Sequence, residues 1–257
     1  MREIMTGNEA IARGAWEAGV NIAAAYPGTP STEILENLSK YKEVYSQWTT
    51  NEKVALELAA GACFAGSRAL AAMKHVGLNV AADPLFTLAY TGVNAGLLIV
   101  TADDPGLFSS QNEQDNRYYA SHAKIAMFEP SDSQECVDFV KEAYEISEKF
   151  DIPVLFRVTT RICHSKSMVN LSDRPQISIK KYVKNVEKYV MAPANAKKRK
   201  FEMENRIKAL KEYSETTPLN RIELRDSEIG IITSGISYKH AKEVFGEKAS
   251  YLKLGFT

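Results

Sequence analysis

The chain has few cysteines, and the three that it has are far apart. Cys63, Cys136 and Cys163 form no C-x-x-C pair in the 257 residues, so this chain alone can hold neither a zinc ribbon nor an iron–sulfur cluster. Hydrophobic residues make up 45% of the sequence and charged residues 25%, which excludes collagen, a disordered tail and a disulfide-stapled mini-protein. We expect reduced thiols in a cytoplasmic protein.

Long apolar runs, an excess of charge and glycine-rich nucleotide motifs are also absent. No stretch approaches the roughly 20 apolar residues of a membrane helix, and residues 1–14 lack the apolar region of a signal peptide. The 32 basic residues balance 32 acidic ones, so we expect binding to neither nucleic acid nor a membrane. Without a G-x-G-x-x-G or P-loop motif, nucleotide binding of the Rossmann or P-loop kind has no support.

Short apolar segments alternate with helical patterns through the first 160 residues. Such segments, which lack polar alternation, are typical of a parallel sheet that helices cover on both faces, and the fold class is therefore α/β. The strands are expected at 21–25, 44–49, 68–74, 97–102, 124–128 and 154–159. The helices are expected at 9–18 with Asn8 as cap, at 33–41, at 51–65, and at 132–150 with Ser131 as cap.

The pattern changes after residue 163 and divides the chain into three parts. Residues 1–164 form the first α/β domain, and residues 165–218 form a polar linker whose charged helix exposes Lys197–Lys200 to solvent. Residues 219–257 begin a second α/β domain. Because its strands and helix are too few to cover a parallel sheet, we expect the chain to be the N-terminal part of a longer polypeptide.

Two segments at the ends of expected strands carry candidate site residues. The first is Tyr26-Pro27-Gly28-Thr29-Pro30-Ser31-Thr32, which is either a stiff ligand-binding loop or a plain strand-to-helix turn. The second contains Glu52 at the start of a helix, where a carboxylate either serves a site or complements the helix dipole. Glu57 lies about 140° further around that helix, so the two carboxylates cannot share one site.

The third candidate region combines the loops after two later strands. One loop is Lys74–Asn79, and the other runs from Asp103-Asp104-Pro105-Gly106 through Ser109 to Arg117. Carboxyl ends of parallel strands meet at one edge of a sheet, so these loops are expected to lie beside the first two. His75 is either catalytic or a buried structural histidine, and the polar loop 109–117 is either a flap over a site or solvated surface.

Taken in order, these motifs resemble one family. The resemblance rests on Tyr26–Ser31, Asn51–Ala55, Met73–Asn79, Asp103–Gly106 and Ser109–Asp115. They look like the N-terminal part of the alpha subunit of indolepyruvate:ferredoxin oxidoreductase, a thiamine diphosphate-dependent 2-oxoacid oxidoreductase. The resemblance runs from Thr6 to about Ser165 and resumes near Ile229, and it implies a pyrimidine-binding domain followed by a transketolase C-terminal-like domain.

The resemblance also implies roles for individual residues. Glu52 matches the family glutamate that binds N1′ of the cofactor and thereby lets the 4′-nitrogen take a proton from C2. Pro27, Gly28 and Thr29 fall at the cofactor, and a second set falls on the substrate side. This second set consists of Thr29, His75, Asn79, Asp103, Asp104 and Asn112.

One departure from the related pyruvate enzymes bears on the substrate. Those enzymes carry an arginine for the substrate carboxylate where this sequence has Asp103-Asp104. An arginine–carboxylate fork cannot form there, which argues against pyruvate and favours a bulkier aryl pyruvate. Arg117 is a candidate replacement for the arginine.

The family's G-D-G motif with its metal-ligating asparagine and its cysteine motifs for [4Fe–4S] clusters do not occur here. The resemblance therefore implies that the diphosphate, its Mg²⁺ and the clusters are bound outside this chain, which has no metal ligands and is expected to be inactive alone. It further implies coenzyme A, ferredoxin, a beta subunit and a homodimer contact as partners. The alternatives are another 2-oxoacid:ferredoxin oxidoreductase and a non-catalytic assembly module.

Overall fold

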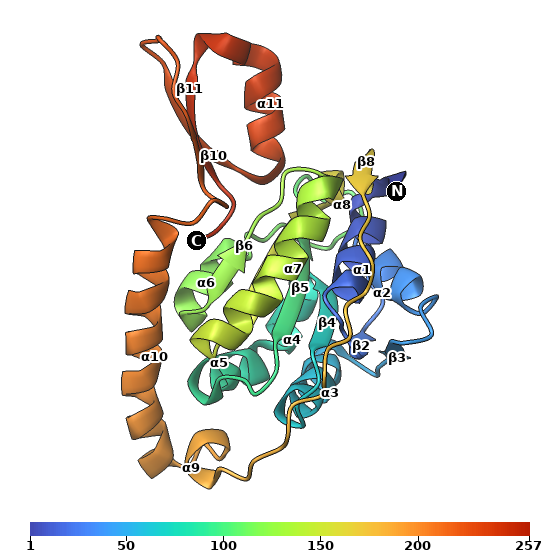
Figure 1. The fold of residues 1–257 in the computed structure, drawn as a ribbon, viewed down its shortest axis with the longest axis vertical. Helices are drawn as coiled ribbons and strands as arrows, with labels where there is room; N and C mark the ends of the chain where they lie inside the picture. Colours follow the sequence, from blue (N-terminus) through green and yellow to red (C-terminus); the bar gives the residue numbers. More distant parts are fainter.

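A six-stranded parallel sheet forms the centre of the computed structural model, which describes residues 1–257 (Figure 1). Every strand pairing in this sheet is parallel, which confirms the α/β fold expected from the sequence. In spatial order the strands are β3 (Tyr45–Trp48), β2 (Ile22–Ala25), β4 (Ala69–Lys74), β5 (Leu97–Asp103), β7 (Val154–Thr159) and β6 (Ala126–Phe128).

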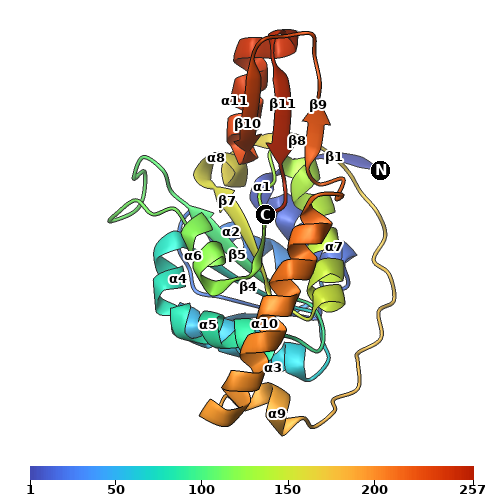
Figure 2. The ribbon, with the colours of Figure 1, turned by 90° about the vertical axis from the view of Figure 1, so that its left-hand side faces the viewer.

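Helices cover both faces of this sheet, and Figure 2 shows α4, α5 and α6 on one side of the strands and α7 on the other. The helices are α1 (Gly7–Glu17), α2 (Thr32–Leu38), α3 (Glu52–Phe64), α4 (His75–Val80), α5 (Ala82–Thr91), α6 (Arg117–Ala123) and α7 (Ser133–Phe150). On one face α1 packs against α2 and α7, and on the other α3 packs against α4 and α5. All seven residues of β5 are buried as a result.

The caps of two helices differ from those expected. Helix α1 is capped by Thr6, whose hydroxyl accepts a hydrogen bond from the Glu9 N–H in a reciprocal capping box. Asn8, the expected cap, is instead inside the helix and donates to the Pro30 carbonyl. Helix α7 is capped by Asp132 rather than Ser131, because the Asp132 carboxylate accepts from the Glu135 N–H at 2.9 Å.

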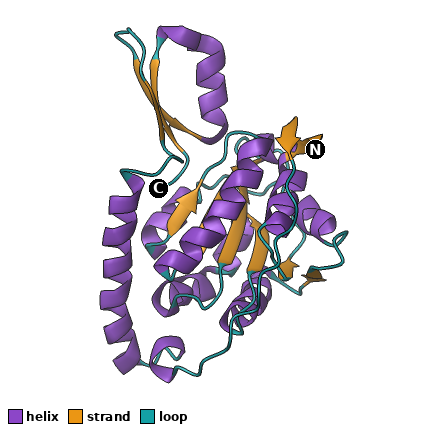
Figure 3. Ribbon diagram, viewed as in Figure 1, coloured by secondary structure: helices purple, strands orange, loops and turns teal.

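A two-stranded antiparallel sheet that the sequence did not predict joins the beginning of the chain to residues 166–170. Strand β1 (Arg2–Thr6) pairs with β8 (Lys166–Asn170), which follows the short helix α8 (Thr160–His164). The expected linker therefore begins as a strand, and only then does the chain run as a long loop along the outside to α9 (Val186–Tyr189) (Figure 3).

The charged helix of the linker region is α10 (Pro193–Ser214), and it is not simply a solvated helix. Arg199 donates to the carbonyls of Tyr90 and Thr91 at the end of α5, at 3.0 and 3.1 Å. Arg206, 8% exposed, donates to the Ala89 carbonyl and pairs with Asp151. The prediction that Lys197–Lys200 faces solvent was therefore wrong for Arg199, whose guanidinium caps a distant helix end.

The last part of the chain is a three-stranded sheet above the first (Figure 1). It consists of β9 (Arg221–Glu223), β10 (Gly230–Ser234) and β11 (Ser250–Leu254) in the order β10-β11-β9, with α11 (Gly235–Phe245) and a short 3₁₀ turn (Gly246–Lys248). Lys253, fully buried, pairs with Glu135 of α7, and Lys239 pairs with Asp132 at 2.6 Å. The domain boundaries at 164 and 218 stay predictions.

None of the helices combines the length and the apolar character that crossing a membrane requires.

Candidate functional site

Four loops that the sequence analysis singled out follow β2, β3, β4 and β5, four parallel neighbours in one sheet. Their carboxyl ends therefore meet at one edge, which is where open α/β sheets bind ligands. Lys74 links two of these loops. A methyl group on Gly28 would lie 2.9 Å from its Cδ, and its ammonium donates to the Ser109 carbonyl at 3.0 Å. The sequence analysis had not singled out Lys74 itself.

Glu52 opens α3 and is 8% exposed. The cap of this helix is Asn51, whose side chain accepts from the Val54 N–H at 3.0 Å. The Glu52 carboxylate takes part in no hydrogen bond or ion pair within the chain, and its oxygens keep some contact with solvent although the residue as a whole is buried. Glu57, on the same helix, has a side chain that is 53% exposed, so the two carboxylates lie apart as the helical spacing predicted.

Gly77 in the first turns of α4 determines where the Glu52 side chain lies. A methyl group in place of a Gly77 hydrogen would stand 2.6 Å from both Cγ and Oε1 of Glu52. No real side chain tolerates so close an approach, so the glycine creates the space that the carboxylate occupies. The spacing of 25 residues between Glu52 and Gly77 in the sequence thus corresponds to direct contact in the structure.

The loop after β2 contains Pro27, Gly28 and Thr29. Thr29 and Pro27 are exposed, and the Thr29–Pro30 peptide bond is cis. The Gly28 carbonyl accepts from both the backbone and the hydroxyl of Ser31 at 2.9 Å, and the Gly28 N–H donates to the Thr32 hydroxyl. These local bonds hold the loop and leave the Thr29 hydroxyl free of partners within the chain.

His75 is fully buried and its two ring nitrogens differ sharply. Nε2 lies 2.9 Å from the Asn112 carbonyl, which only accepts, so Nε2 carries a proton and donates. Nδ1 is buried without a partner. The structure therefore brings together two residues of the predicted substrate side, His75 and Asn112, through a backbone contact. Their role toward a substrate stays a prediction.

Asp103 is engaged inside the protein. It is fully buried and accepts from the Asn116 N–H at 3.1 Å and from Arg157 at 2.8 Å. Arg157 also pairs with Glu129, which is 5% exposed. Burial raises the pKa of Asp103 above its ordinary value, although the Arg157 guanidinium opposes that shift. Sequence reasoning missed Arg157, and its signal was an arginine inside the apolar strand VLFRVT.

Asp104 organises the loop that follows β5. Its Oδ2 accepts from the Ser109 N–H at 2.8 Å and the Ser110 hydroxyl at 2.7 Å, and its Oδ1 accepts from the Thr160 hydroxyl at 2.8 Å. Burial alone would raise the pKa of Asp104, but these hydrogen bonds outweigh it and lower the pKa below its ordinary value. Loop 109–117 is thus tied to the sheet edge at several points.

The two remaining candidates, Asn79 and Arg117, also have partners within the chain. The Asn79 side-chain oxygen accepts from the Tyr119 hydroxyl at 2.6 Å. Arg117, the candidate for a substrate carboxylate, already donates to the Asp115 carboxylate at 2.8 Å, and its side chain is 49% exposed. Binding a substrate carboxylate with Arg117 would require this pair to open.

Comparison with known proteins identifies the family of this chain. Residues 13–224 match the family model described as pyruvate flavodoxin/ferredoxin oxidoreductase, thiamine diphosphate-binding. The chain belongs to this family. The resemblance drawn from the sequence motifs is thereby confirmed at the level of the family.

The relatives of this family member include several curated archaeal proteins. Indolepyruvate oxidoreductase subunit IorA from Methanothermobacter marburgensis is 45% identical over 265 residues, which cover 100% of this chain and 43% of that protein. The same subunit from Archaeoglobus fulgidus is 45% identical, covering 93% of this chain and 40% of that protein. The chain thus spans less than half the length of these relatives.

Two further comparisons involve more distant proteins. A 2-oxoglutarate synthase subunit KorA from Methanothermobacter thermautotrophicus is 30% identical over 66% of this chain and 48% of that protein. A solved structure of 2-oxoglutarate:ferredoxin oxidoreductase from Magnetococcus marinus, with 2-oxoglutarate, coenzyme A and succinyl-CoA bound, superposes with a TM-score of 0.80 at 17% identity. It covers 99% of this chain and 54% of that one.

The family description implies thiamine diphosphate, and the residues around Glu52 fit one part of it. The buried, unpaired carboxylate of Glu52 provides the acceptor that a protonated or imino pyrimidine nitrogen requires. No three histidine, cysteine or acidic side chains gather where they could hold a metal ion. The fit within this chain is thus to the pyrimidine ring.

Proposed function

We propose that this chain supplies the pyrimidine-binding half of a thiamine diphosphate-dependent 2-oxoacid:ferredoxin oxidoreductase, with indolepyruvate or a similar aryl pyruvate as substrate. The observation that carries the proposal is the Glu52 carboxylate, buried at a helix start and without a partner in the chain. The substrate assignment is supported by 43–46% identity to archaeal subunits named for indolepyruvate.

When bound, thiamine diphosphate supplies the carbanion and the electron sink for oxidative decarboxylation of a 2-oxoacid. This chain contributes the proton control. Glu52 would accept a hydrogen bond from N1′ of the bound pyrimidine ring and would so favour the imino form of its 4′-nitrogen. Gly77 lets the carboxylate lie in that place, since any larger residue would displace it. Pro27, Gly28 and Thr29 form the exposed loop at the same sheet edge where the ring would lie.

The substrate side is formed by the loops after β4 and β5. We assign Thr29, His75, Asn79 and Asn112 to it, with Asp103 and Asp104 holding the loop that carries Asn112. Arg157 and Arg117 beside these loops are both occupied by carboxylates, so neither is free to pair with the carboxylate of a 2-oxoacid. In our proposal the substrate at these loops is therefore held mainly by its aryl group.

The remaining parts of the reaction lie outside this chain in our proposal. The Mg²⁺ and diphosphate site, the [4Fe–4S] clusters, a beta subunit and a homodimer partner complete the cytoplasmic enzyme. Coenzyme A takes the acyl group and ferredoxin the electrons. Less than half the length of the curated relatives is present here, which leaves room for those sites. We therefore expect this chain alone to show no turnover, and measurable turnover would contradict that expectation.

A non-catalytic assembly module is the alternative from a different class. A scaffold gains nothing from a buried carboxylate without a partner, which costs folding free energy unless a ligand supplies the missing hydrogen bond. Another 2-oxoacid oxidoreductase is the nearer alternative, and turnover of 2-oxoglutarate or pyruvate in preference to indolepyruvate would establish it.

The test is single-turnover decarboxylation of indolepyruvate by the complete enzyme with Glu52→Gln, using Glu57→Gln on the exposed face of the same helix as the matched control. We expect the first variant to lose about 10²-fold or more, the size of a positioned proton-transfer group, and the second to keep the wild-type rate. Equal rates in both variants would refute the placement of the pyrimidine ring at Glu52.

A further inference from the structure

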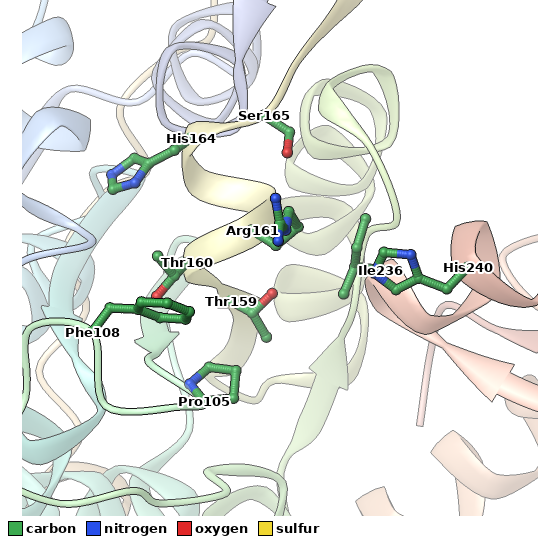
Figure 4. A pocket seen from close by; sticks show the side chains of 9 residues that line it. All are labelled: Pro105, Phe108, Thr159, Thr160, Arg161, His164, Ser165, Ile236 and His240. Carbon is green, nitrogen blue, oxygen red and sulfur yellow. The ribbon is translucent and has the colours of Figure 1, made fainter.

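A cleft of about 460 Å³ lies between the end of β7 and the start of α11, apart from Glu52 (Figure 4). One wall comes from α8 and the loop after β5, and the other from the first turns of α11. Its volume is within the range of small-ligand sites. The residues that line it are Pro105, Phe108, Thr159, Thr160, Arg161, His164, Ser165, Ile236 and His240.

Arg161 carries the one permanent charge among the residues that line this cleft. The Arg161 side chain is exposed and makes no ion pair or hydrogen bond within the chain, whereas Arg157 on the preceding strand is paired. His164 and His240 are the other ionisable groups, and no acidic residue lines the cleft. Two carboxylates lie behind the lining: Asp104 accepts from the Thr160 hydroxyl at 2.8 Å, and Glu33 lies 3.9 Å from His164. An anion that enters the cleft meets the unpaired guanidinium of Arg161, while the Asp104 carboxylate is already bound by Thr160, Ser109 and Ser110.

Neutral donors add to this preference for an anion. The hydroxyl oxygen of Thr159 is shielded from water and has no partner in the chain, whereas buried hydroxyls nearly always have one. In Figure 4 it points from the β7 wall toward the space between Arg161 and Ile236. The wall opposite is the N-terminal end of the 11-residue helix α11, whose dipole favours negative charge.

The mouth of the cleft offers an apolar surface beside the charged one. Phe108 is 77% exposed, a large fraction for a phenylalanine, and lies on the loop that Asp104 holds to the sheet edge. Ile236 lies on the opposite wall (Figure 4). A ligand that fits both surfaces carries a phosphate and a flat apolar or aromatic part, because an exposed aromatic ring stacks on a base or similar ring system.

We propose that this cleft binds an organic phosphate, with the phosphate against Arg161 and His240 and the flat part against Phe108 and Ile236. The proposal stands on the cleft alone and does not require Glu52 to activate a cofactor. Where the proposed function holds, coenzyme A is the organic phosphate that the reaction consumes. A free adenine nucleotide presents the same chemistry.

The test measures binding of coenzyme A, ADP and inorganic phosphate to the complete enzyme by titration calorimetry at one fixed ionic strength. In Arg161→Ala we expect the two nucleotides to bind at least tenfold more weakly, with part of the affinity restored in Arg161→Lys. Phe108→Ala is expected to weaken the nucleotides and leave inorganic phosphate unchanged. Lys197→Ala, which removes an exposed cation of α10, is the matched control and should change nothing.

Wild-type affinity in folded Arg161→Ala, or an equal loss in Lys197→Ala, would overturn the proposal. Tenfold tighter binding of coenzyme A than of ADP supports the site and identifies coenzyme A as its ligand, whereas equal affinities support the site and identify a free nucleotide. Glu52→Gln separates this result from the proposed function, since it should retain nucleotide binding. If that variant also kept full turnover, the proposed function would fail while the Arg161-dependent binding stood.

Discussion

Glu52 and Asp103 are buried acidic residues at the same edge of one parallel sheet, yet their partners differ. Asp103 accepts through Oδ2 from the Asn116 backbone and pairs with Arg157, which also pairs with Glu129, while its Oδ1 is buried without a partner. Glu52 has no hydrogen bond or ion pair within the chain, and its side chain lies close to Gly77. A carboxylate whose hydrogen bonds are supplied by the chain stabilises the fold, whereas one left without them is suited to a ligand. This contrast distinguishes the structural part of the edge from the proposed site.

The largest effect is expected on the paired side. Arg157→Met removes the cation that two buried carboxylates share, and we expect the free energy of unfolding to fall by about 3–5 kcal/mol. The loss should shrink as the pH is lowered, because the variant raises the pKa of Asp103 further and the carboxyl then takes up a proton in the folded state. Denaturant unfolding at pH 8 and pH 5 measures both effects.

Arg161→Met is the control for that measurement. Arg161 is an exposed arginine four residues further along without an ion pair, so its replacement should change stability by less than about 0.5 kcal/mol. A similar loss of stability in both variants would mean that the buried ion pairs of Arg157 contribute no more to the free energy of unfolding than an exposed arginine does.

Gly77→Ala tests the packing on the unpaired side. The new methyl group would meet Cγ and Oε1 of Glu52 at 2.6 Å. We expect a net loss of about 1–2 kcal/mol, since overpacking costs ~1–3 kcal/mol and alanine returns up to ~1 kcal/mol in a helix. Turnover of the complete enzyme should fall as well, because the carboxylate is displaced. Gly61→Ala on α3, where the added methyl group meets nothing within 4 Å, should instead raise stability.

Glu52→Gln should raise the free energy of unfolding, whereas Arg157→Met and Gly77→Ala should lower it. Replacing a buried carboxylate that lacks a partner removes an unfavourable charge, so we expect about 1 kcal/mol more stability in the absence of cofactor. Thermal unfolding of wild type and variant without added thiamine diphosphate measures the gain. A clear loss of stability would mean that Glu52 has a structural partner after all and belongs with Asp103.

The smallest effect concerns Asp104 and its dependence on pH. Because its folded-state pKa is lowered, its contribution to stability is complete above the ordinary aspartate pKa and is lost as the pH falls through the lowered one. The difference in unfolding free energy between wild type and Asp104→Asn should therefore be under about 1 kcal/mol at pH 6 and should shrink toward pH 3. A difference that grows on acidification would contradict the hydrogen bonds from Ser109, Ser110 and Thr160.

The sequence predicts what local patterns encode. The apolar run LLIVTA gave β5, and Glu52 after Asn51 gave the start of α3, because a strand buried on both faces and a capped helix have local signatures. Arg157, Arg199 and β1 were missed for a common reason. Their partners lie at Asp103, Thr91 and residues 166–170, and pairings between distant segments leave no periodic trace in one sequence.

The hydrogen bonds from α10 to the end of α5 have a consequence for the order of folding. The carbonyls of Ala89, Tyr90 and Thr91 receive their hydrogen bonds from arginines 108 to 117 residues later in the chain. Loop closure over such separations is slow compared with helix formation. We therefore expect the amide hydrogens in the last turn of α5 to exchange with solvent until α10 docks. This turn then becomes protected late, although its residues precede α10 in the chain.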